Sequence, residues 1–340
     1  MKAIQFHEFG GPEVLRYEDI PDPVLRKDQV LIRVKACALN HLDLWIRKGL
    51  PNITLPHING SDVAGVIEEV GEYVTGLKQG QRVLLAPMTF CNHCAACTSG
   101  QQNFCREFTV LGNGNQGGNR ELMAVPPVNV IPIPDRLGFN EAASVPLVFL
   151  TAWHMLVSRA QIRPGQVVLV LGAGSGVGSA AIQIAKLFHA TVIATAGGES
   201  KLTKARELGA DFMVDHYKQK ISDEVKKITG RQGVDIVLEH VGAATWEESM
   251  KSLKPGGTIV TCGATTGPEA KFDIRFLFVR QLSFLGSFMG TMGDLYEVLG
   301  HVFAGALKPV VDRTFPLKDA AEAHRYLESS QMFGKVVLVP

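Results

Sequence analysis

The sequence predicts an α/β fold in which a β-rich part precedes a doubly wound, six-stranded parallel sheet. The first ~130 residues contain short runs of Val, Ile and Leu separated by proline and glycine, which is typical of strands. From residue 167 onward, strand and helix patterns alternate along the chain. Such alternation indicates a parallel sheet with helices on both faces. A glycine-rich turn after the first of these strands is the third observation.

Length and composition favour an ordinary two-domain enzyme. The chain has 340 residues, of which 46% are hydrophobic and 20% charged. Its net charge of +1 argues against a nucleic-acid or anionic membrane partner. The N-terminus lacks the apolar core of a signal peptide, and the longest apolar run, Ala142–Val157, is too short and interrupted to span a bilayer. We therefore expect a cytoplasmic enzyme that acts on a small molecule.

The N-terminal part is expected to contain at least three strands. Val30–Ala36 alternates apolar and polar residues at its centre, as a half-buried strand does. Asp62–Val70 and Arg82–Ala86 are rich in Val, Ile and Leu and lie near glycines. The prolines that separate these runs mark loops, because a strand interior excludes them: Pro21, Pro23, Pro51 and Pro56.

Near residue 140 the pattern changes from strands to helices. Asn140 is a suitable helix cap, and a long apolar helix over Glu141–Ser158 is expected after it. The six strands that follow are Val167–Leu171, Thr191–Thr195, Phe212–Val214, Asp235–Leu238, Thr258–Cys262 and Ser283–Gly286. The helices between them are Val177–Phe188, Ser200–Leu208, Ile221–Thr229 and Thr245–Leu253, with a turn at Pro255–Gly257. Two helices, Asp294–Ala304 and Lys318–Ser329, and a strand, Lys335–Val339, complete the chain.

The glycine-rich turn predicts a dinucleotide site. Residues 172–178 form the run Gly-Ala-Gly-Ser-Gly-Val-Gly between a strand and a helix of small residues. Glycine lets the backbone approach a pyrophosphate, and a helix N-terminus supplies free N–H groups and a positive dipole end. The spacing departs from a strict GxGxxG, because Ser179 takes the third position counted from Gly174. The residues assigned to the cofactor here are Gly172, Gly174, Gly176, Val177 and Gly178.

The second strand of the parallel sheet favours NADP(H) over NAD(H). An NAD site usually has an acidic residue at the end of this strand, where it binds the adenosine ribose. Here the strand ends at Thr195 and is followed by Ala-Gly-Gly, with Lys201 close behind. A small neutral tip beside a cation suits a 2′-phosphate. The alternative is NAD(H), with Glu199 on the ribose and Lys201 in solvent.

Four of the six cysteines have the spacing of a structural zinc site. Cys91, Cys94, Cys97 and Cys105 lie on one short loop, and four thiolates close a tetrahedron around Zn²⁺. An iron–sulfur cluster is the main alternative, but the spacing to the last cysteine is longer than in the bacterial ferredoxin run. The sequence predicts one zinc ion per chain, in a lobe over residues 88–108. Cys37 and Cys262 are expected to be core residues.

At this point the chain resembles the medium-chain dehydrogenase/reductase superfamily of zinc alcohol dehydrogenases and quinone oxidoreductases. The matching motifs are residues 59–65 (Asn-Gly-Ser-Asp-Val-Ala-Gly), Ala142–Trp153, the glycine turn and the closing run 334–338 (Gly-Lys-Val-Val-Leu). The resemblance implies a GroES-like catalytic domain over residues 1–148 and 289–340. It also implies a Rossmann domain over residues 149–288 and a cleft that holds the nicotinamide.

The sequence departs from the zinc-catalytic members of this superfamily at all three ligand positions. Asn40, Ser61 and Leu147 stand where those members have their catalytic zinc ligands. None of the three supplies a thiolate or an imidazole, so none holds Zn²⁺ tightly. The chain is similar here to the zinc-free quinone oxidoreductases, although that branch usually lacks the four-cysteine lobe. We expect a structural zinc without a catalytic one.

The resemblance also implies roles for individual residues. Without a Lewis acid, hydride transfer from NADPH suits a quinone or another conjugated carbonyl. Asn40 would donate a hydrogen bond to the developing oxyanion, with Asp43 near the nicotinamide. Trp45 would form an apolar wall, and Ser61 would contact substrate or fill the vacated ligand position. The implied cofactor contacts are His41 at the pyrophosphate, Ser200, Lys201 and His216 at the 2′-phosphate, Thr195 at the strand tip, and Val241, Gly242, Gly263 and Ala264 at the nicotinamide ribose and ring.

Two other functions stay open at this stage. One is an alcohol or aldehyde dehydrogenase that uses protein groups or a second zinc held in another way. The other is a non-catalytic NADPH-binding protein. For assembly, the last strand of a sheet in the order 3-2-1-4-5-6, Ser283–Gly286, is an exposed edge. We expect subunits to pair there, as a homodimer or a homotetramer.

Overall fold

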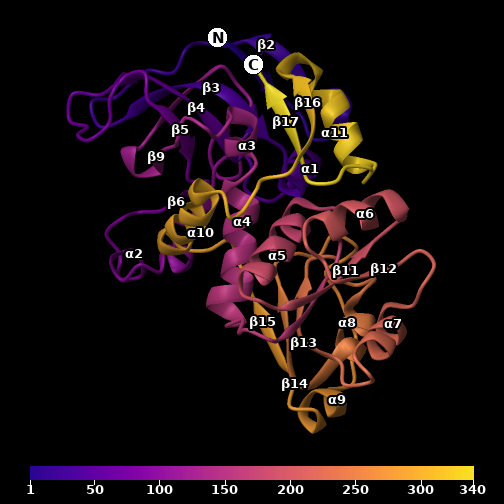
Figure 1. Cartoon of the computed structure of the whole chain (residues 1–340). Coiled ribbons are helices and arrows are strands. Elements are labelled where there is room, and N and C mark those ends of the chain that lie inside the picture. The colour runs from indigo at the N-terminus through magenta and orange to yellow at the C-terminus, as the bar shows by residue number, and fades with distance from the viewer. The chain divides into compact units, whose positions relative to one another are not determined.

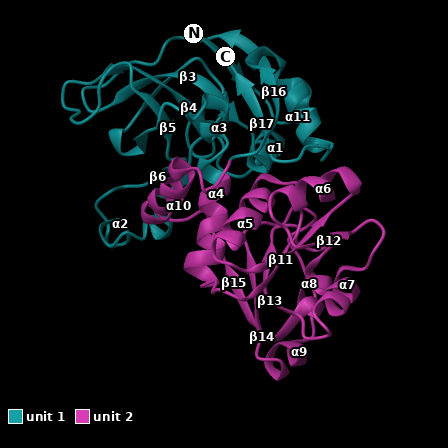
Figure 2. Ribbon diagram, viewed as in Figure 1, with its two compact units in different colours: residues 1–147, 309–340 teal, residues 148–308 magenta.

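The computed structural model describes residues 1–340 and divides into two units (Figures 1 and 2). Unit 1 contains residues 1–147 and 309–340, and unit 2 contains residues 148–308. None of the helices combines the length and the apolar character needed to cross a bilayer.

Unit 1 is built on a seven-stranded sheet. Along the sheet its strands are β16 (Val311–Pro316), β17 (Lys335–Val339), β3 (Val30–Ala38), β4 (Asp62–Val70), β5 (Arg82–Leu85) and β9 (Val130–Pro132), and β8 (Leu122–Val125) also pairs with β3. Val30, Ile32 and Val34 of β3 are buried together with Val63 and Ile67 of β4. Each such buried side chain contributes about 1.5–3 kcal/mol. The apolar residues of the alternating pattern that predicted β3 are therefore the ones that face the core.

Shorter elements complete unit 1. β1 (Lys2–Gln5) pairs with β2 (Arg16–Asp19), and β6 (Met88–Thr89) pairs with β7 (Thr109–Val110) beside α2 (Ala95–Thr98). Unit 1 also contains the helices α1 (His41–Gly49), which carries residues of the site, and α11 (Ala320–Glu328). The sequence did not predict α1. It begins directly after β3, where the Asn40 backbone N–H donates to the Asp43 carboxylate at 2.7 Å and closes the first turn.

The prediction of one long helix over Glu141–Ser158 is wrong. The structure has α3 (Phe139–Ala143), α4 (Pro146–Trp153) and a π-helix over His154–Arg159. Pro146 explains the interruption, because proline has no N–H to donate and disfavours a helical residue before it. The cap also differs from the prediction, since Gly138 and not Asn140 precedes the first helical turn.

Unit 2 contains the predicted parallel sheet with the predicted strand order. The order is β12 (Phe212–Asp215), β11 (Thr191–Ala196), β10 (Val167–Val170), β13 (Val234–Glu239), β14 (Leu253–Thr261) and β15 (Ser283–Gly286). Its helices are α5 (Gly176–Leu187), α6 (Glu199–Glu207), α7 (Ile221–Ile228), α8 (Trp246–Ser252), α9 (Ile274–Val279) and α10 (Met292–Ala304). This is the doubly wound arrangement of a Rossmann domain. α9 was not predicted, and the turn expected at Pro255–Gly257 is an irregularity inside β14, where the register with β13 shifts.

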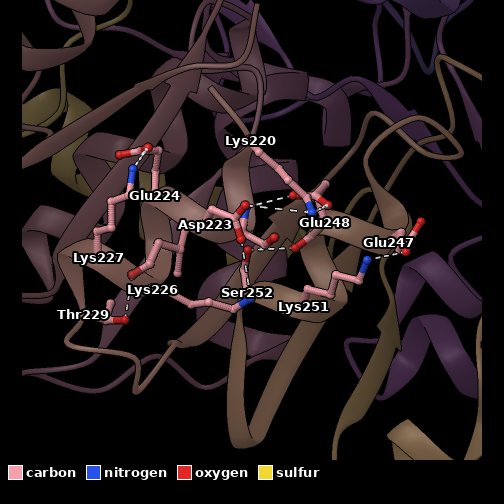
Figure 3. A network of polar contacts seen from close by, with 12 residues as sticks. Lys220, Asp223, Glu224, Lys226, Lys227, Thr229, Glu247, Glu248, Lys251 and Ser252 are labelled. Atoms are coloured by element: carbon pink, nitrogen blue, oxygen red, sulfur yellow. Dashed lines mark hydrogen bonds and ion pairs between the residues drawn. The ribbon is translucent and has the colours of Figure 1, made fainter. Parts of the chain in front are cut away.

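Figure 3 shows a network of ion pairs and hydrogen bonds among side chains of α7, α8 and the residue before α7. Lys220 lies 4.0 Å from Glu248, and the Ser222 N–H donates to the same Glu248 carboxylate at 2.9 Å. Lys227 pairs with Glu224 at 2.6 Å within α7. Because such pairs are exposed, each contributes only about 0–1 kcal/mol, and the two helices are held mainly by their buried faces.

The structure moves one predicted domain boundary. Residues 289–308, which the sequence placed in the catalytic domain, lie in unit 2. The reason is that α10 packs on the helical segment at the start of unit 2. The Asp294 carboxylate lies 2.8 Å from His154 Nδ1, and Trp153 Nε1 donates to Glu297 at 3.1 Å.

Candidate active site and zinc site

Asn40, Asp62 and Lys335 form a buried polar cluster in unit 1. Sheet pairing brings them together, because Ala38 lies opposite both Asp62 of β4 and Val337 of β17. Lys335 Nζ donates to Asn40 Oδ1 at 2.6 Å and to Asp62 Oδ2 at 2.8 Å. Asn40 Nδ2 donates to the same Asp62 oxygen at 3.0 Å. An ammonium group is thus held inside the protein by an acid and an amide.

Asp62 also connects this cluster to Leu147. The Leu147 N–H donates to Asp62 Oδ1 at 2.7 Å. Two of the three positions predicted to have lost a zinc ligand, Asn40 and Leu147, are therefore joined through one carboxylate. The third, Ser61, is fully buried and its hydroxyl has no hydrogen-bond partner. An amide, a hydroxyl and an apolar side chain do not match the thiolate and imidazole ligands of a catalytic zinc site.

Asp43 is a fully buried carboxylate that orders the backbone around this cluster. One of its oxygens accepts from the Asn40 N–H at 2.7 Å, and the other accepts from the Gly60 N–H at 3.0 Å. Burial raises the pKa of Asp43 to about 6. Both oxygens of Asp43 therefore bind the backbone of unit 1. Trp45, on the same helix, is 36% exposed, whereas His41 is half-buried.

The glycine turn has the strand–turn–helix setting that the sequence predicted. Ser175 caps α5, where its Oγ accepts from the Gly178 N–H at 2.9 Å. The Gly172 N–H donates to Thr195 Oγ1 at 3.2 Å, so Thr195 supports the turn from the neighbouring strand. A Cβ atom at Gly178 would lie 2.4 Å from the Gly172 carbonyl oxygen, which makes glycine necessary there. Gly176 and Val177 begin α5, and Gly174 precedes its Ser175 cap. The free N–H groups at this end of the helix can hold a pyrophosphate.

The tip of β11 is small and neutral, as predicted. Gly198, at φ +86°, precedes α6, and Ser200 and Lys201 lie in the first turn of that helix. His216 follows β12, and burial together with the Lys201 charge lowers its pKa. The sequence missed Tyr217, whose ring packs so closely on Gly197 that a Cβ there would lie 2.2 Å from a ring carbon.

Three of the residues predicted at the nicotinamide line one cavity of unit 2. Gly242 follows β13, and Gly263 and Ala264 follow β14. The cavity has a volume of about 380 Å³, and its wall includes the rings of Trp246 and Phe272. Carboxyl ends of neighbouring parallel strands are where open α/β sheets bind ligands. Sequence reasoning missed Glu239, the fully buried last residue of β13, whose carboxylate accepts from the Gly242 N–H at 3.1 Å. A charged residue at a strand end was the available signal.

The four predicted cysteines fit a structural zinc ion. Their sulfur atoms all lie within 4.8 Å of one another. The Sγ of Cys91 lies 3.8 Å from that of Cys97 and 3.6 Å from that of Cys105. A zinc ion with sulfur ligands at 2.3 Å in a tetrahedron needs S···S distances of about 3.8 Å. Backbone N–H groups of His93 and Cys94 lower the pKa of Cys91 to about 6, which favours the thiolate that a zinc ion binds.

Comparison with known proteins agrees with these features. A family described as alcohol dehydrogenase GroES-like domain matches residues 26–135, and one described as zinc-binding dehydrogenase matches residues 176–304. A quinone oxidoreductase of Rattus norvegicus is 32% identical over 100% of this chain and 98% of its own length. An NAD-dependent alcohol dehydrogenase of Sulfurisphaera tokodaii is 32% identical over 100% of both chains. The crystal structure of an NAD-dependent alcohol dehydrogenase is 46% identical, with a TM-score of 0.97 and 100% of both chains covered.

The chain belongs to the medium-chain dehydrogenase/reductase superfamily. It is an oxidoreductase, because relatives with that activity match it along its whole length. Within the superfamily it combines a zinc-competent cysteine lobe with a cluster of Asn40, Asp62 and Lys335.

Proposed function

We propose that this oxidoreductase transfers a hydride from NADPH to a quinone or another conjugated carbonyl, with one structural zinc ion and no catalytic one. The observation that carries the proposal is the cluster of Asn40, Asp62 and Lys335. Its lysine places a fixed positive charge against the only carboxylate of the cluster, and a second cation beside it would be repelled. An acceptor that is already activated by conjugation suits such a site.

The bound nicotinamide would supply the hydride, and the chain would position the acceptor. Asn40 is 7% exposed. Its Nδ2 carries two hydrogens, of which Asp62 accepts one, and the other is available for an oxygen of the acceptor. Lys335 fixes the amide orientation, because its ammonium binds Asn40 Oδ1. Trp45, on the exposed face of α1, offers a flat apolar surface for a ring.

NADPH is favoured over NADH by the neutral tip of β11. Ser200 and Lys201 lie in the first turn of α6, where a hydroxyl, an ammonium and the helix N-terminus suit a 2′-phosphate. The alternative also has support. The relatives at 32% and 46% identity that are named NAD-dependent alcohol dehydrogenases favour NAD(H) and an alcohol substrate.

A substrate panel separates these two functions. Protein purified without added metal is mixed with NADPH or NADH and with a benzoquinone, an enone or an aldehyde, while the absorbance of the reduced nicotinamide is followed. Benzyl alcohol with NAD⁺ or NADP⁺ tests the reverse direction. We expect NADPH oxidation by the quinone and the enone. Turnover of benzyl alcohol alone, dependent on added zinc, would instead establish the alcohol dehydrogenase.

We also propose a homodimer that forms at the edge strand β15. The segments just before and just after β15 expose large apolar side chains, and monomeric proteins rarely expose a large contiguous apolar patch. The exposed fractions are 68% for Ile274, 64% for Phe278 and 69% for Val279 of α9, and 60% for Phe288 after β15. In such a dimer, β15 of one copy would pair with β15 of the other, so that the two sheets form one continuous sheet. The exposed apolar side chains would then be covered by the second copy.

A further inference from the structure

Glu239 is a buried carboxylate whose hydrogen bonds all come from one turn and the helix after it. It ends β13 and is fully buried. Its Oε1 accepts from the Val241 N–H at 2.7 Å and from the Gly242 N–H at 3.1 Å. Its Oε2 accepts from the hydroxyl of Thr245 at 2.9 Å and of Ser249 at 2.6 Å. Four donors thus converge on a charge that has no lysine or arginine partner within salt-bridge distance.

The turn that Glu239 holds is joined to the turn after β14. The Val241 carbonyl accepts from both the N–H and the hydroxyl of Thr266, each at 2.8 Å. Gly242 lies at φ +93°, and a Cβ there would lie 2.7 Å from the Gly267 carbonyl oxygen. These two turns carry Gly242 and Gly263 into the cavity described above. Without the Glu239 carboxylate, both turns that line this cavity would therefore lose hydrogen bonds that hold their conformation.

The next residue, His240, holds the glycine turn. Its Nε2 lies 2.9 Å from the Leu171 carbonyl oxygen and 3.4 Å from Ser175 Oγ. A Cβ at Gly172 would lie 2.9 Å from the His240 ring. The dipeptide Glu239–His240 therefore contacts the glycine turn with one side chain and the turn after β13 with the other. If a dinucleotide binds along this edge of the sheet, His240 would support the turn at its pyrophosphate, and Glu239 would support the turn at its nicotinamide half.

We infer that Glu239 is a positioning residue that holds the turn after β13 in the shape that receives the nicotinamide half of the dinucleotide. The inference rests on the proposed cofactor. A buried carboxylate is costly, and a neutral side chain would be sufficient for packing alone. What the charge adds is four strong hydrogen bonds that hold one backbone conformation. Glu239 contacts neither the adenosine side of the site nor the glycine turn, so its effect should be confined to the nicotinamide half.

The test compares whole dinucleotides with fragments that lack the nicotinamide. Dissociation constants of NADPH, NADH, 2′,5′-ADP and 5′-AMP are measured by calorimetry for the native protein and for Glu239→Gln. Glutamine keeps the size but replaces one accepting oxygen with an N–H₂ group. We expect about tenfold weaker binding of the dinucleotide that the native protein prefers, because charged hydrogen bonds to the turn are lost. Binding of the matching fragment should change less than about twofold.

Two further variants make the result specific. Glu247→Gln on the same helix α8 is the matched control, because Glu247 is exposed and pairs only with Lys251. It should bind all four ligands as the native protein does. Thr245→Val removes one donor and leaves the carboxylate, so it should shift dinucleotide binding in the same direction by a smaller factor. This variant decides the question if Glu239→Gln does not fold.

The possible outcomes separate failure of the inference about Glu239 from failure of the proposed function. If the native protein binds neither NADPH nor NADH, the proposed function fails and the inference fails with it. If the native protein binds a dinucleotide and Glu239→Gln binds it equally well, only the inference fails. Equal weakening of dinucleotide and fragment would show a general structural role and would also overturn it.

Discussion

Lys335 Nζ lies 2.8 Å from the Asp62 carboxylate, and the two side chains are 4% and 0% exposed. The two residues begin strands β17 and β4, which are 273 positions apart in the chain and are joined through β3. The pair also binds Asn40 and the Leu147 N–H, so it joins two of the three positions that the sequence predicted to lack a catalytic zinc ligand.

The first prediction concerns this ion pair. Lys335→Met leaves the Asp62 charge buried without a cation, so the free energy of unfolding should fall by about 3–5 kcal/mol. Urea denaturation followed by circular dichroism measures it. The double variant Lys335→Met, Asp62→Asn should recover part of the loss, because it removes the unpaired charge. A single variant as stable as the native protein would contradict this account of the cluster.

The second prediction concerns cofactor choice. Lys201→Ala should weaken NADPH binding by about 1.5–3 kcal/mol, because a charged contact to the 2′-phosphate is lost. NADH binding should stay unchanged, and so should NADPH binding in Lys204→Ala, one turn further along α6. Fluorescence titration of the reduced nucleotides provides both affinities. Equal affinities of the native protein for NADPH and NADH would show that the neutral tip of β11 does not select the phosphate.

The third prediction concerns metal content. Elemental analysis of protein purified without added metal should find one zinc ion per chain, bound by the four cysteines. Cys94→Ser should lower the thermal midpoint, since a structural zinc site contributes on the order of 10 kcal/mol of binding energy. The folded fraction should still oxidise NADPH. Two tightly held zinc ions, with activity lost on removal of the second, would establish catalysis by metal.

The fourth prediction concerns assembly. Light scattering at micromolar concentration should give the mass of a dimer or of a larger even-numbered assembly. Phe278→Asp places a charge among the exposed apolar side chains of α9 and should shift the mass toward the monomer. Val24→Asp is the control, because Val24 is 86% exposed and lies in unit 1. A native protein that is monomeric under these conditions would rule out pairing at β15.

The fifth prediction concerns acid stability. Burial, with a smaller effect of the Arg47 charge, lowers the pKa of His324 to about 3. In the unfolded chain this imidazole takes up a proton near its ordinary value of 6.5. Between these two values the unfolded state binds more protons, so stability should fall as the pH falls, by up to about 1.4 kcal/mol per pH unit.

The measurement for His324 is urea denaturation at several pH values between 3 and 7. His324→Gln keeps an acceptor for the Arg47 guanidinium, which lies 3.0 Å from His324 Nδ1, but it does not titrate. Its stability should therefore depend less on pH than that of the native protein. Identical slopes in the native protein and in His324→Gln would contradict the assignment.

Local pattern was sufficient for the strand order and the glycine turn of unit 2, although not for α9, because β–α alternation and glycine spacing are properties of neighbouring residues. The parallel strands, the glycine turn and the neutral tip of β11 all lie where the sequence predicted them. Prediction from local pattern failed where a single proline or a long-range contact decides the structure. Pro146 interrupts an apolar run that otherwise has helical character, and the segment 289–308 belongs to unit 2 through the contacts of Asp294 and Glu297.

The sequence by itself determined the superfamily and the cysteine lobe, and it predicted three positions without a thiolate or imidazole for a catalytic zinc ion. Only the tertiary structure decided what stands there instead. Lys335 was visible in the sequence only as part of a closing motif, and Glu239 only as one acid among many. Their roles depend on strand pairing and on burial, which bring together groups far apart in the chain or remove one carboxylate from water. A buried polar group such as the Lys335 ammonium or the Glu239 carboxylate needs hydrogen-bond partners, and the tertiary fold decides which residues supply them.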